Sequence, residues 1–532
     1  MASTTHLRSR RSAAQLHAVA GVEREIRMQD SHGRQKYLRD FNRAFRNYEK
    51  PLNAEELRAT TYAADVVLIG DYHALPAAQR QAASLIEQRA LAGDRPVVLG
   101  VETIFARDQH ILDEWWRREI DEQELRQRIR FDLEWGYEWA PFCELLVAAR
   151  DHGEGLYGLD CMPREDLRRI GARDKHAALK IREIRERHPA AVIFVLFGES
   201  HLAPAHLPRV LQQQLSENKI LTVLQNVDAL YWRAAGEQAD KIDAVQVSDD
   251  VVCVFNATPL EKYESYRLFL DQWNRCDDGP DFAPTIYNLI DSLAKFLEIN
   301  RYSPHNGTQP KFLVDMLPEV YGGASDALLQ RLLSRKGISE QDRESMLATV
   351  EQRGSAYLPA VNAFYIREFQ MIQASEDATR FLHHACRGLP DRLNGSLASD
   401  IPDNDRVHIL DRVYARVVEE AVAFFGSRVL HPSRPAPEST SSSQLSRAAL
   451  EKALLAAVDI DSDEREACVQ QWGYRIGQQI YDAYLAGKVA PTSVRRLFLI
   501  HLDEPGVARK VCATVIAKLR SIARPSSRSA HA

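Results

Sequence analysis

Short apolar runs alternate with amphipathic stretches over the central part of the chain. The amphipathic stretches, such as 79–92 and 207–215, carry apolar residues at the spacing of a helix. The apolar runs are strand candidates, and they cover residues 65–70, 96–102, 156–160, 191–197, 220–224 and 251–255. Apolar strands that alternate with helices are typical of a mostly parallel sheet flanked by helices on both faces. We therefore predict the α/β fold class for residues 61–260.

The pattern changes on both sides of this domain. Residues 23–48 place several aromatic side chains roughly on one helical face within a polar, charged segment. Beyond residue 260, leucines recur at helical spacing, so we predict that an all-α C-terminal region follows the α/β domain. The expected organisation is a helical and polar N-terminal extension (1–60), the α/β domain (61–260), a helical region (261–430), a linker (431–446), a C-terminal helical domain (447–520) and a disordered tail (521–532).

Composition and net charge indicate which kinds of molecule the protein is expected to bind. The chain has 532 residues, of which 45% are hydrophobic and 27% are charged, as in globular proteins with more than one core. Its net charge of −6 provides no basic surface for phosphate groups, so nucleic acid is not an expected partner. No apolar stretch is long enough to span a bilayer, so no transmembrane segment is expected.

The seven cysteines are scattered along the chain and never form a C-x-x-C pair. This spacing argues against a disulfide framework and against a thiolate zinc site. The N-terminus carries early positive charge, but the sustained apolar core of a secretory signal does not follow. We therefore expect a cytoplasmic protein in a reducing compartment.

Two copies of the motif G-x-x-H directly follow apolar runs, as G-D-Y-H at 70–73 and G-E-S-H at 198–201. Glu102 ends the second strand candidate, and Asp160 ends the third. Ligands bind where the carboxyl ends of parallel strands meet, so we expect these groups to converge at one edge of the sheet. The glycine allows a sharp turn after each strand, which lets the histidine point back over the sheet.

The residue types at this edge suit more than one chemistry. His73, Glu102 and His201 offer the mixture of imidazole and carboxylate that Mn, Fe and Zn accept. The same residues could activate water or act as a metal-free acid–base pair. Haem iron needs instead an axial His or Tyr and an apolar slot. The further candidates for contact with a cofactor are Asp71, Tyr72, Tyr137, Asp160 and Glu199.

Each of these residues also has a structural explanation when it is taken alone. The G-x-x-H pattern is common, and an Asp at a strand end often caps the next helix. A functional site is favoured because four polar groups end four consecutive strand candidates. His383 and His384 lie in a charged helical segment, where we expect a solvated pair. The tryptophans expected to pack in the core are Trp115, Trp116, Trp135 and Trp139.

In this order the motifs resemble the ChaN-like haem-binding uptake family, which is related to Tiki-type proteases and erythromycin esterases. The resemblance covers about residues 62–230 and rests on Leu-Ile-Gly-Asp-Tyr-His73, Val-Val-Leu-Gly-Val-Glu102 and Val-Leu-Phe-Gly-Glu-Ser-His201. It implies an α/β core with a site on His73, Glu102 and His201. Members of the family bind haem, while relatives carry out metal-dependent hydrolysis. The resemblance therefore implies haem or a divalent metal ion (Mn, Fe or Zn) as the cofactor.

Three hypotheses about function follow. In the first, His73 and His201 bind haem or a metal ion, with Glu102 as a ligand or general base, in the handling of iron or haem. In the second, the protein is a metal-dependent hydrolase of esters or amides, in which Glu102 activates water. In the third, the protein is a non-catalytic scaffold whose helical half binds a protein partner. Whether the chain is an enzyme is left open at this point.

Overall fold

The structure is a computed structural model that divides into two compact units. The first, here the sheet unit, is Glu23–Asn274, and the second, here the helical unit, combines Met1–Val22 with Arg275–Ala532. The first helix, α1 (Ala2–Gln29), contributes residues to both units. The structure describes residues 2–30, 36–162, 170–237, 242–275, 280–300, 313–323, 326–335, 337–387, 406–437, 446–460 and 462–523.

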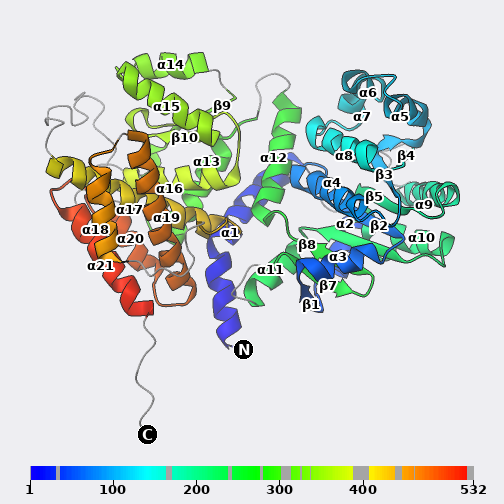
Figure 1. Ribbon diagram of the computed structural model, residues 1–532, viewed down its shortest axis with the longest axis horizontal. Coiled ribbons are helices and arrows are strands. Elements are labelled where there is room, and N and C mark those ends of the chain that lie inside the picture. The colour runs from blue at the N-terminus through cyan, green and yellow to red at the C-terminus, as the bar shows by residue number, and fades with distance from the viewer. Residues whose placement is uncertain are drawn as a thin grey trace, which may run out of the picture. The chain divides into compact units, whose positions relative to one another are not determined.

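An eight-stranded sheet forms the centre of the sheet unit (Figure 1). The strand order is β1-β7-β8-β6-β2-β5-β3-β4; β7 pairs antiparallel with β1 and with β8, and the remaining neighbours pair parallel. The predicted α/β class with a mostly parallel sheet is therefore confirmed. The strands are β1 (Lys50–Leu52), β2 (Val66–Asp71), β3 (Val97–Phe105), β4 (Gly155–Asp160), β5 (Val192–Gly198), β6 (Ile220–Gln225), β7 (Ala244–Ser248) and β8 (Val251–Val254).

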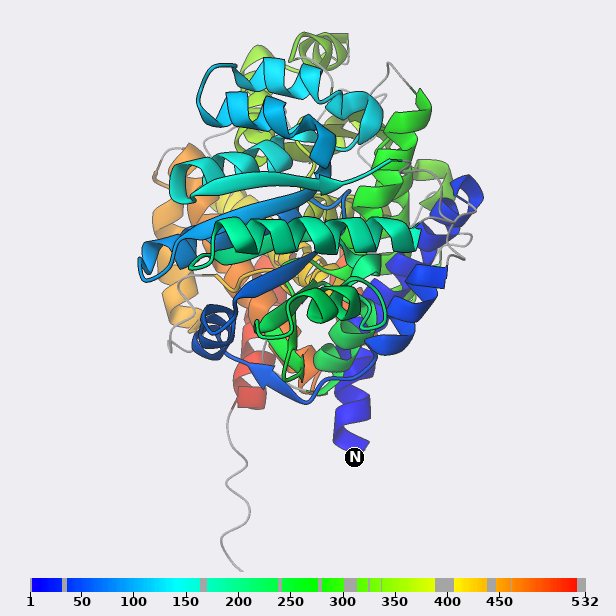
Figure 2. The same cartoon turned by 90° about the vertical axis from the view of Figure 1, so that its right-hand side faces the viewer.

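Helices cover both faces of this sheet (Figure 2). One face packs against α4 (Pro76–Leu91) and α8 (Trp139–His152). The other packs against α2 (Lys36–Ala44), α9 (Ile170–Arg187), α10 (Leu207–Gln214) and α11 (Asp228–Glu237). Because both faces are covered, the central strands are buried along their whole length, which explains their continuous apolar runs. The unit also contains α3 (Ala54–Tyr62), α5 (Gln109–Trp116), α6 (Glu122–Arg128), α7 (Phe131–Glu134) and α12 (Pro259–Arg275), with short 3₁₀ turns at Ala106–Asp108 and Glu199–Leu202.

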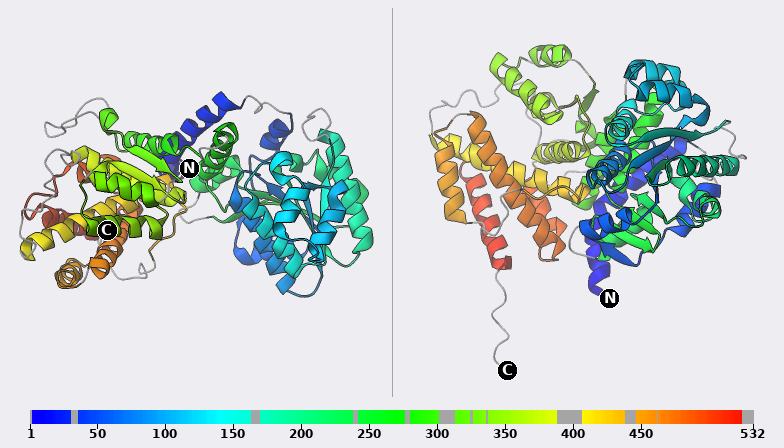
Figure 3. Two further views of the ribbon diagram at one scale, coloured as in Figure 1. Left: turned by 90° about the horizontal axis from the view of Figure 1, so that it is seen from above. Right: turned by 45° about the vertical axis from the view of Figure 1, so that its right-hand side comes forward.

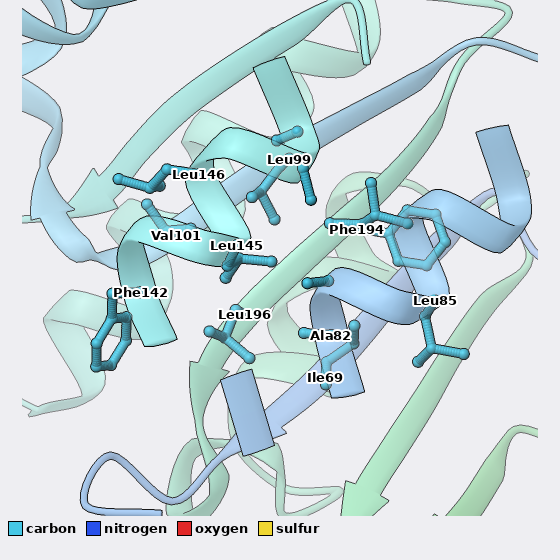
Figure 4. Close-up of a cluster of buried hydrophobic side chains, with 14 of the residues drawn as sticks. Ile69, Ala82, Leu85, Leu99, Val101, Phe142, Leu145, Leu146, Phe194 and Leu196 are labelled. Atoms are coloured by element: carbon cyan, nitrogen blue, oxygen red, sulfur yellow. The ribbon is translucent and has the colours of Figure 1, made fainter. Parts of the chain in front are cut away.

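Successive strand residues point to opposite faces of the sheet. Ile69, Leu99 and Phe194 face α4 and α8 in one core (Figure 4), whereas the neighbouring Leu68 and Val98 face the other core. The sheet unit therefore has two apolar layers, one on each side of the strands. The tryptophans predicted to be core residues are buried in the first layer or packed against it: Trp115, Trp116, Trp135 and Trp139.

The four strands that carry candidate site residues at or near their carboxyl ends lie side by side, in the order β2-β5-β3-β4, although β3 extends past Glu102 to Phe105. Asp71 of β2 pairs with Gly198 of β5, so the two G-x-x-H motifs leave neighbouring strands at the same edge. β3, which carries Glu102, lies on the far side of β5 and next to β4, which ends in Asp160. The chain order of the strands differs from their order in the sheet, yet the expected convergence is present.

β3 is irregular where Glu102 lies. Its pairing with β4 shifts register between Val101 and Phe105, which is the behaviour of a bulge. Gly158 makes this shift possible, because a Cβ at that position would come within 2.7 Å of the Phe105 carbonyl oxygen. Bulges re-aim side chains at the rims of sheets, and this one carries Glu102 toward the end of β5.

The helical unit consists mainly of helices, as predicted for the C-terminal region (Figure 3). Its largest packing contacts are those of α17 with α19 and with α16. Among the described residues, no helix has the length and apolarity to cross a bilayer. Half of the expected linker (438–445) and the tail from 524 onward lie outside the described residues. The helices are α13 (Ala283–Phe296), α14 (Asp326–Arg335), α15 (Glu340–Arg353), α16 (Met371–Arg387), α17 (Arg406–Leu430), α18 (Arg447–Ala457), α19 (Ser462–Leu485), α20 (Pro491–Leu499) and α21 (Val507–Ala523), with 3₁₀ turns at Leu313–Met316 and Pro359–Val361.

A small sheet interrupts this region, which the sequence pattern predicted to be wholly helical. β9 (Glu319–Gly322), β10 (Ser355–Leu358) and β11 (Ala363–Ile366) form a separate three-stranded sheet. Each strand has only four residues, which is too short to display a strand periodicity in the sequence.

The expectation of a solvated histidine pair is wrong. His383 is buried in α16, and this burial lowers the pKa of its imidazole well below its usual value. Most of α16 between Ala374 and Cys386 is buried, because neighbouring helices pack around it. Its charged residues are therefore paired inside the unit, as Arg380 is with Glu420, and the charge of the segment is a poor guide to its exposure.

The core under α4 and α8 should depend strongly on Leu99, which is fully buried at the centre of β3. We expect Leu99→Ala to lower the free energy of unfolding of the sheet unit by about 3 kcal/mol, because it leaves a cavity in a packed layer. Urea unfolding followed by circular dichroism measures the change. The control is Leu91→Ala at the end of α4, where the side chain is 80% exposed, and we expect a change below about 0.5 kcal/mol. Equal effects of the two substitutions would contradict this account of the core.

Candidate functional site

His73 lies just beyond the end of β2 and its side chain is 25% exposed. Its Nδ1 donates to Oδ2 of Asp71 at 2.7 Å. The other oxygen of Asp71 accepts a hydrogen bond from Nε2 of Gln79, which lies in α4, at 2.5 Å. Since a carboxylate oxygen accepts, Nδ1 carries the proton, and the neutral ring has its lone pair on Nε2. Asp71 and Gln79 therefore fix both the tautomer and the orientation of His73.

Glu102 is buried, and both of its oxygens accept hydrogen bonds. Oε1 accepts from Nη2 of Arg173, and Oε2 accepts from the backbone N–H of Gly198 at 2.5 Å. The same guanidinium reaches Asp160, with Nε at 2.8 Å from Oδ1 and Nη2 at 3.0 Å from Oδ2. Arg173 belongs to α9, so one helical residue bridges the carboxylate of Glu102 in β3 and that of Asp160 at the end of β4.

The electrostatics of this cluster favour an ionised Glu102. Burial alone would raise the pKa of Glu102, but Arg173, the two histidines and the Gly198 N–H outweigh it and lower the pKa from 4.5 to about 2. The same pairing raises the pKa of the Arg173 guanidinium despite its burial. Glu102 and Asp160 therefore serve as partners of an internal cation.

His201, the histidine of the second motif, is buried behind Glu102, with a side chain only 5% exposed. Its Nδ1 donates to Oδ1 of Asp174 at 2.5 Å, and Oδ2 of Asp174 accepts from the hydroxyl of Tyr37 at 2.7 Å. Nε2 of His201 lies 3.9 Å from Oε1 of Glu102. The two histidines of the repeated motif thus occupy different environments, one partly exposed and one internal.

These residues do not fit the predicted metal site on His73, Glu102 and His201. A divalent ion needs ligand atoms at about 2.0–2.2 Å, and the oxygens of Glu102 already hold a guanidinium and a backbone N–H. Within the described ranges, no three His, Cys, Asp or Glu residues are arranged to hold a metal ion. The positive charge of Arg173 further opposes a second cation at this position.

Glu199, expected near a cofactor, lies instead in a buried ion pair. Nζ of Lys262, from α12, lies 3.0 and 3.1 Å from the two carboxylate oxygens of Glu199. The ammonium group also lies 4.7 Å from the centre of the Tyr72 ring. Burial raises the pKa of Glu199 and raises that of Tyr72 well above its usual value. Burial alone would lower the pKa of Lys262, but its acidic neighbours, chiefly Glu199 and Asp228, outweigh burial and raise that pKa.

Aromatic rings surround His73. The ring of Trp135 is centred 4.5 Å from the imidazole, and that of Tyr137 is centred 5.4 Å from it. Tyr137 in turn stacks on Phe269 of α12 at 4.2 Å. Tyr137, a candidate from the sequence for contact with a cofactor, therefore lies beside His73, and Phe269 is a neighbour that the sequence did not indicate.

Gly198 contributes space to the site. Its φ of −48° is accessible to any residue, so the sharp turn expected of this glycine is not its role. A Cβ at position 198 would lie 3.0 Å from Oε2 of Glu102 and 3.3 Å from Nε2 of His73. The absence of a side chain lets these two groups approach the end of β5 from either side.

The charged residues that complete the site were not identified from the sequence. Arg173 and Asp174 lie in α9, which is so rich in charged residues that charge alone does not indicate which of them are buried. A signal was present, because both share a face with the apolar residues Ala177 and Ile181 at helical spacing. Lys262 offered no comparable signal, since its partner Glu199 is far away in the sequence.

Loss of the bridging cation should change how stability depends on pH. In the wild type, the lowered pKa of Glu102 means that its stabilising contribution is complete above pH 4.5 and is lost as the pH falls to about 2. We expect Arg173→Met to cost about 3–5 kcal/mol at pH 7, because it leaves buried carboxylates unpaired. The variant should then gain stability on acidification toward about pH 5, as a carboxylate takes up a proton.

Urea unfolding of both proteins between pH 3 and 7 measures this difference. Adding Glu102→Gln to Arg173→Met should recover part of the lost stability and flatten the dependence on pH. The control is Arg80→Met, which breaks an exposed pair with Glu144 and should cost less than about 1 kcal/mol. A wild-type pH profile in Arg173→Met would refute the bridging role of this residue.

Comparison with known proteins supports the resemblance of the motifs. Residues 57–193 match the family model described as haem-binding uptake, Tiki superfamily, ChaN. A solved structure of ChaN of Campylobacter jejuni, described as showing cofacial heme binding, is similar to this chain at 15% sequence identity and a TM-score of 0.26. The match covers 38% of this chain and 91% of that chain. No curated protein matches the chain. Residues 57–193 of the sheet unit are therefore similar to the ChaN family of the Tiki superfamily.

Proposed function

We propose that the sheet unit binds haem at the strand-end edge, with His73 as the ligand of the iron, and that the protein acts in the handling of iron or haem. The observation that carries this proposal is the Asp71–His73 pair, which presents an oriented and partly exposed imidazole. This pair lies inside the segment that matches a haem-binding family. Imidazole is the commonest protein ligand of haem iron.

The residues around His73 fit a haem group. A metal-bound histidine usually donates its other ring N–H to a carboxylate, which fixes the ring and makes the ligand more basic. Asp71 stands in that relation to Nδ1 of His73. Haem also needs an apolar, aromatic environment, and Trp135 and Tyr137 lie against the imidazole. Bound haem would supply an iron centre whose chemistry depends on its axial ligand.

The buried charges support this site without touching the ligand. Glu102 accepts the N–H of Gly198 and so fixes the end of β5 beside His73. Arg173 keeps Glu102 ionised and ties α9 to the same edge. His201 lies next to Glu102 on its buried side, and Asp174 holds the ring of His201 in place through a hydrogen bond. In this proposal Glu102 and His201 are positioning residues, rather than the ligands named from the sequence.

The alternative of a metal-dependent hydrolase has weaker support. A general base works best when its pKa is near the working pH, whereas the pKa of Glu102 is lowered to about 2. Arg173 also occupies the side of Glu102 that a metal ion would need. The third hypothesis, a scaffold that binds a protein partner through the helical unit, stays a prediction.

Titration of the full-length protein with haemin tests the role of His73. We expect the wild type to give a saturable shift of the Soret band, and we expect His73→Ala to weaken binding at least 100-fold and to lose the spectrum of histidine ligation. The matched control is His110→Ala, which removes an exposed histidine of α5 and should bind as the wild type does. Wild-type affinity and spectrum in His73→Ala would exclude His73 as the ligand.

The carboxylate of Asp71, which accepts a hydrogen bond from His73, should affect how strongly His73 binds the haem iron. We expect Asp71→Asn to weaken haem binding about 10-fold or more, because an amide polarises Nδ1 less than a carboxylate does. The change should appear in the affinity and in the Soret position, with an unaltered circular dichroism spectrum. Asp132→Asn, at an exposed carboxylate of α7, is the control. If both variants bind haem alike, Asp71 has no part in setting the ligand.

A further inference from the structure

α12 (Pro259–Arg275) presents a row of aromatic side chains. Tyr266, Phe269 and Trp273 are spaced by three and four residues, so they lie on one face of the helix. The rings of Tyr266 and Phe269 are centred 6.1 Å apart and nearly parallel, and those of Phe269 and Trp273 are 5.9 Å apart. This helix lies beyond residue 193, where the match to the family ends.

The row on α12 is continuous with the surroundings of His73. Phe269 stacks on Tyr137 at 4.2 Å, and Tyr137 lies 5.4 Å from the imidazole. Aromatic rings therefore run without interruption from His73 to Trp273. Because these contacts join segments far apart in the sequence, the row is a feature of the folded sheet unit.

Polar contacts hold α12 in place at this edge. Lys262 is paired with Glu199, which directly follows β5, and the hydroxyl of Tyr266 donates to Oδ2 of Asp30 at 2.7 Å. The hydroxyl of Tyr263 donates to Asp228 of α11. These contacts are spread along the helix, so its aromatic face is held in a fixed orientation toward Tyr137.

Trp273 ends the row in an exposed position. Its side chain is 58% exposed, although a large aromatic ring gains most from burial. The ring rests on Gly136, where a Cβ would come within 2.4 Å of Cζ3, and the φ of +74° also favours glycine there. Gly136 thus makes room for the ring of Trp273 on one side, while much of the ring stays exposed and could contact a ligand.

We propose that Tyr137, Phe269 and Trp273 form a stacking wall for the flat ring of a tetrapyrrole, so that α12 completes the binding site beside His73. This inference rests on the proposed function and adds the surface that recognises the macrocycle. A tetrapyrrole is a large, flat and largely apolar ring, which suits offset stacking against aromatic side chains. The wall would recognise the ring itself, with or without iron.

Metal-free protoporphyrin IX separates the wall from the iron ligand. The probe is titrated into full-length wild type, Trp273→Ala, Trp273→Phe and His73→Ala, with binding followed by porphyrin fluorescence. We expect Trp273→Ala to bind protoporphyrin and haemin about tenfold more weakly, Trp273→Phe to retain most of the affinity, and His73→Ala to bind protoporphyrin as the wild type does. A Trp273→Ala, Phe269→Ala double variant should bind the probe more weakly still.

Leu91→Ala is the control for loss of an exposed apolar side chain, and circular dichroism checks each fold. The proposed stacking wall would be contradicted if Trp273→Ala bound protoporphyrin as tightly as the wild type does, or if the wild type did not bind it. Failure of the proposed function looks different. In that case wild type and His73→Ala would bind protoporphyrin through Trp273, but haemin would give the same spectrum in both.

Discussion

The guanidinium of Arg173 is the interaction on which the sheet edge depends. It brings together two buried carboxylates, Glu102 and Asp160, which lie on adjacent parallel strands and would otherwise repel one another. Desolvating such charges is expensive, and only close pairing with several hydrogen bonds offsets the cost. The pairing also has a functional consequence. Since the carboxylates hold an internal cation, the edge is poorly suited to a divalent metal, and the partly exposed His73 becomes the best candidate to meet a ligand.

The two G-x-x-H motifs have the same pattern but different environments. His73 faces aromatic rings and is held by Asp71 and Gln79, whereas His201 is internal and is held by Asp174. Each imidazole donates Nδ1–H to a carboxylate, so the motif supplies an oriented ring in both cases. What differs is whether the surroundings leave the ring exposed. The repeat therefore predicts the orientation of each ring, and the surrounding elements decide whether that ring is exposed.

The sheet, and the edge at which the candidate residues meet, could be predicted from the sequence because they follow from local patterns. Continuous apolar runs indicated β2 and β5, and the polar residues directly after them indicated the edge. Arg173 and Lys262 could not be assigned in the same way, because their roles depend on partners that only the tertiary fold brings close. The four-residue strands β9–β11 are too short for periodicity to reveal them. The many charged residues around His383 suggested that it is exposed to solvent, but it is buried because those charges are paired inside the unit.

The central claim is that an oriented histidine at the end of β2 meets haem iron beside an aromatic wall. A crystal structure of the full-length protein with haem bound tests it most directly. The account predicts iron bonded to Nε2 of His73, with Nδ1 still hydrogen-bonded to Asp71 and the macrocycle against Tyr137 and Trp273. Iron held by a different residue, or haem bound away from this edge of the sheet, would contradict it.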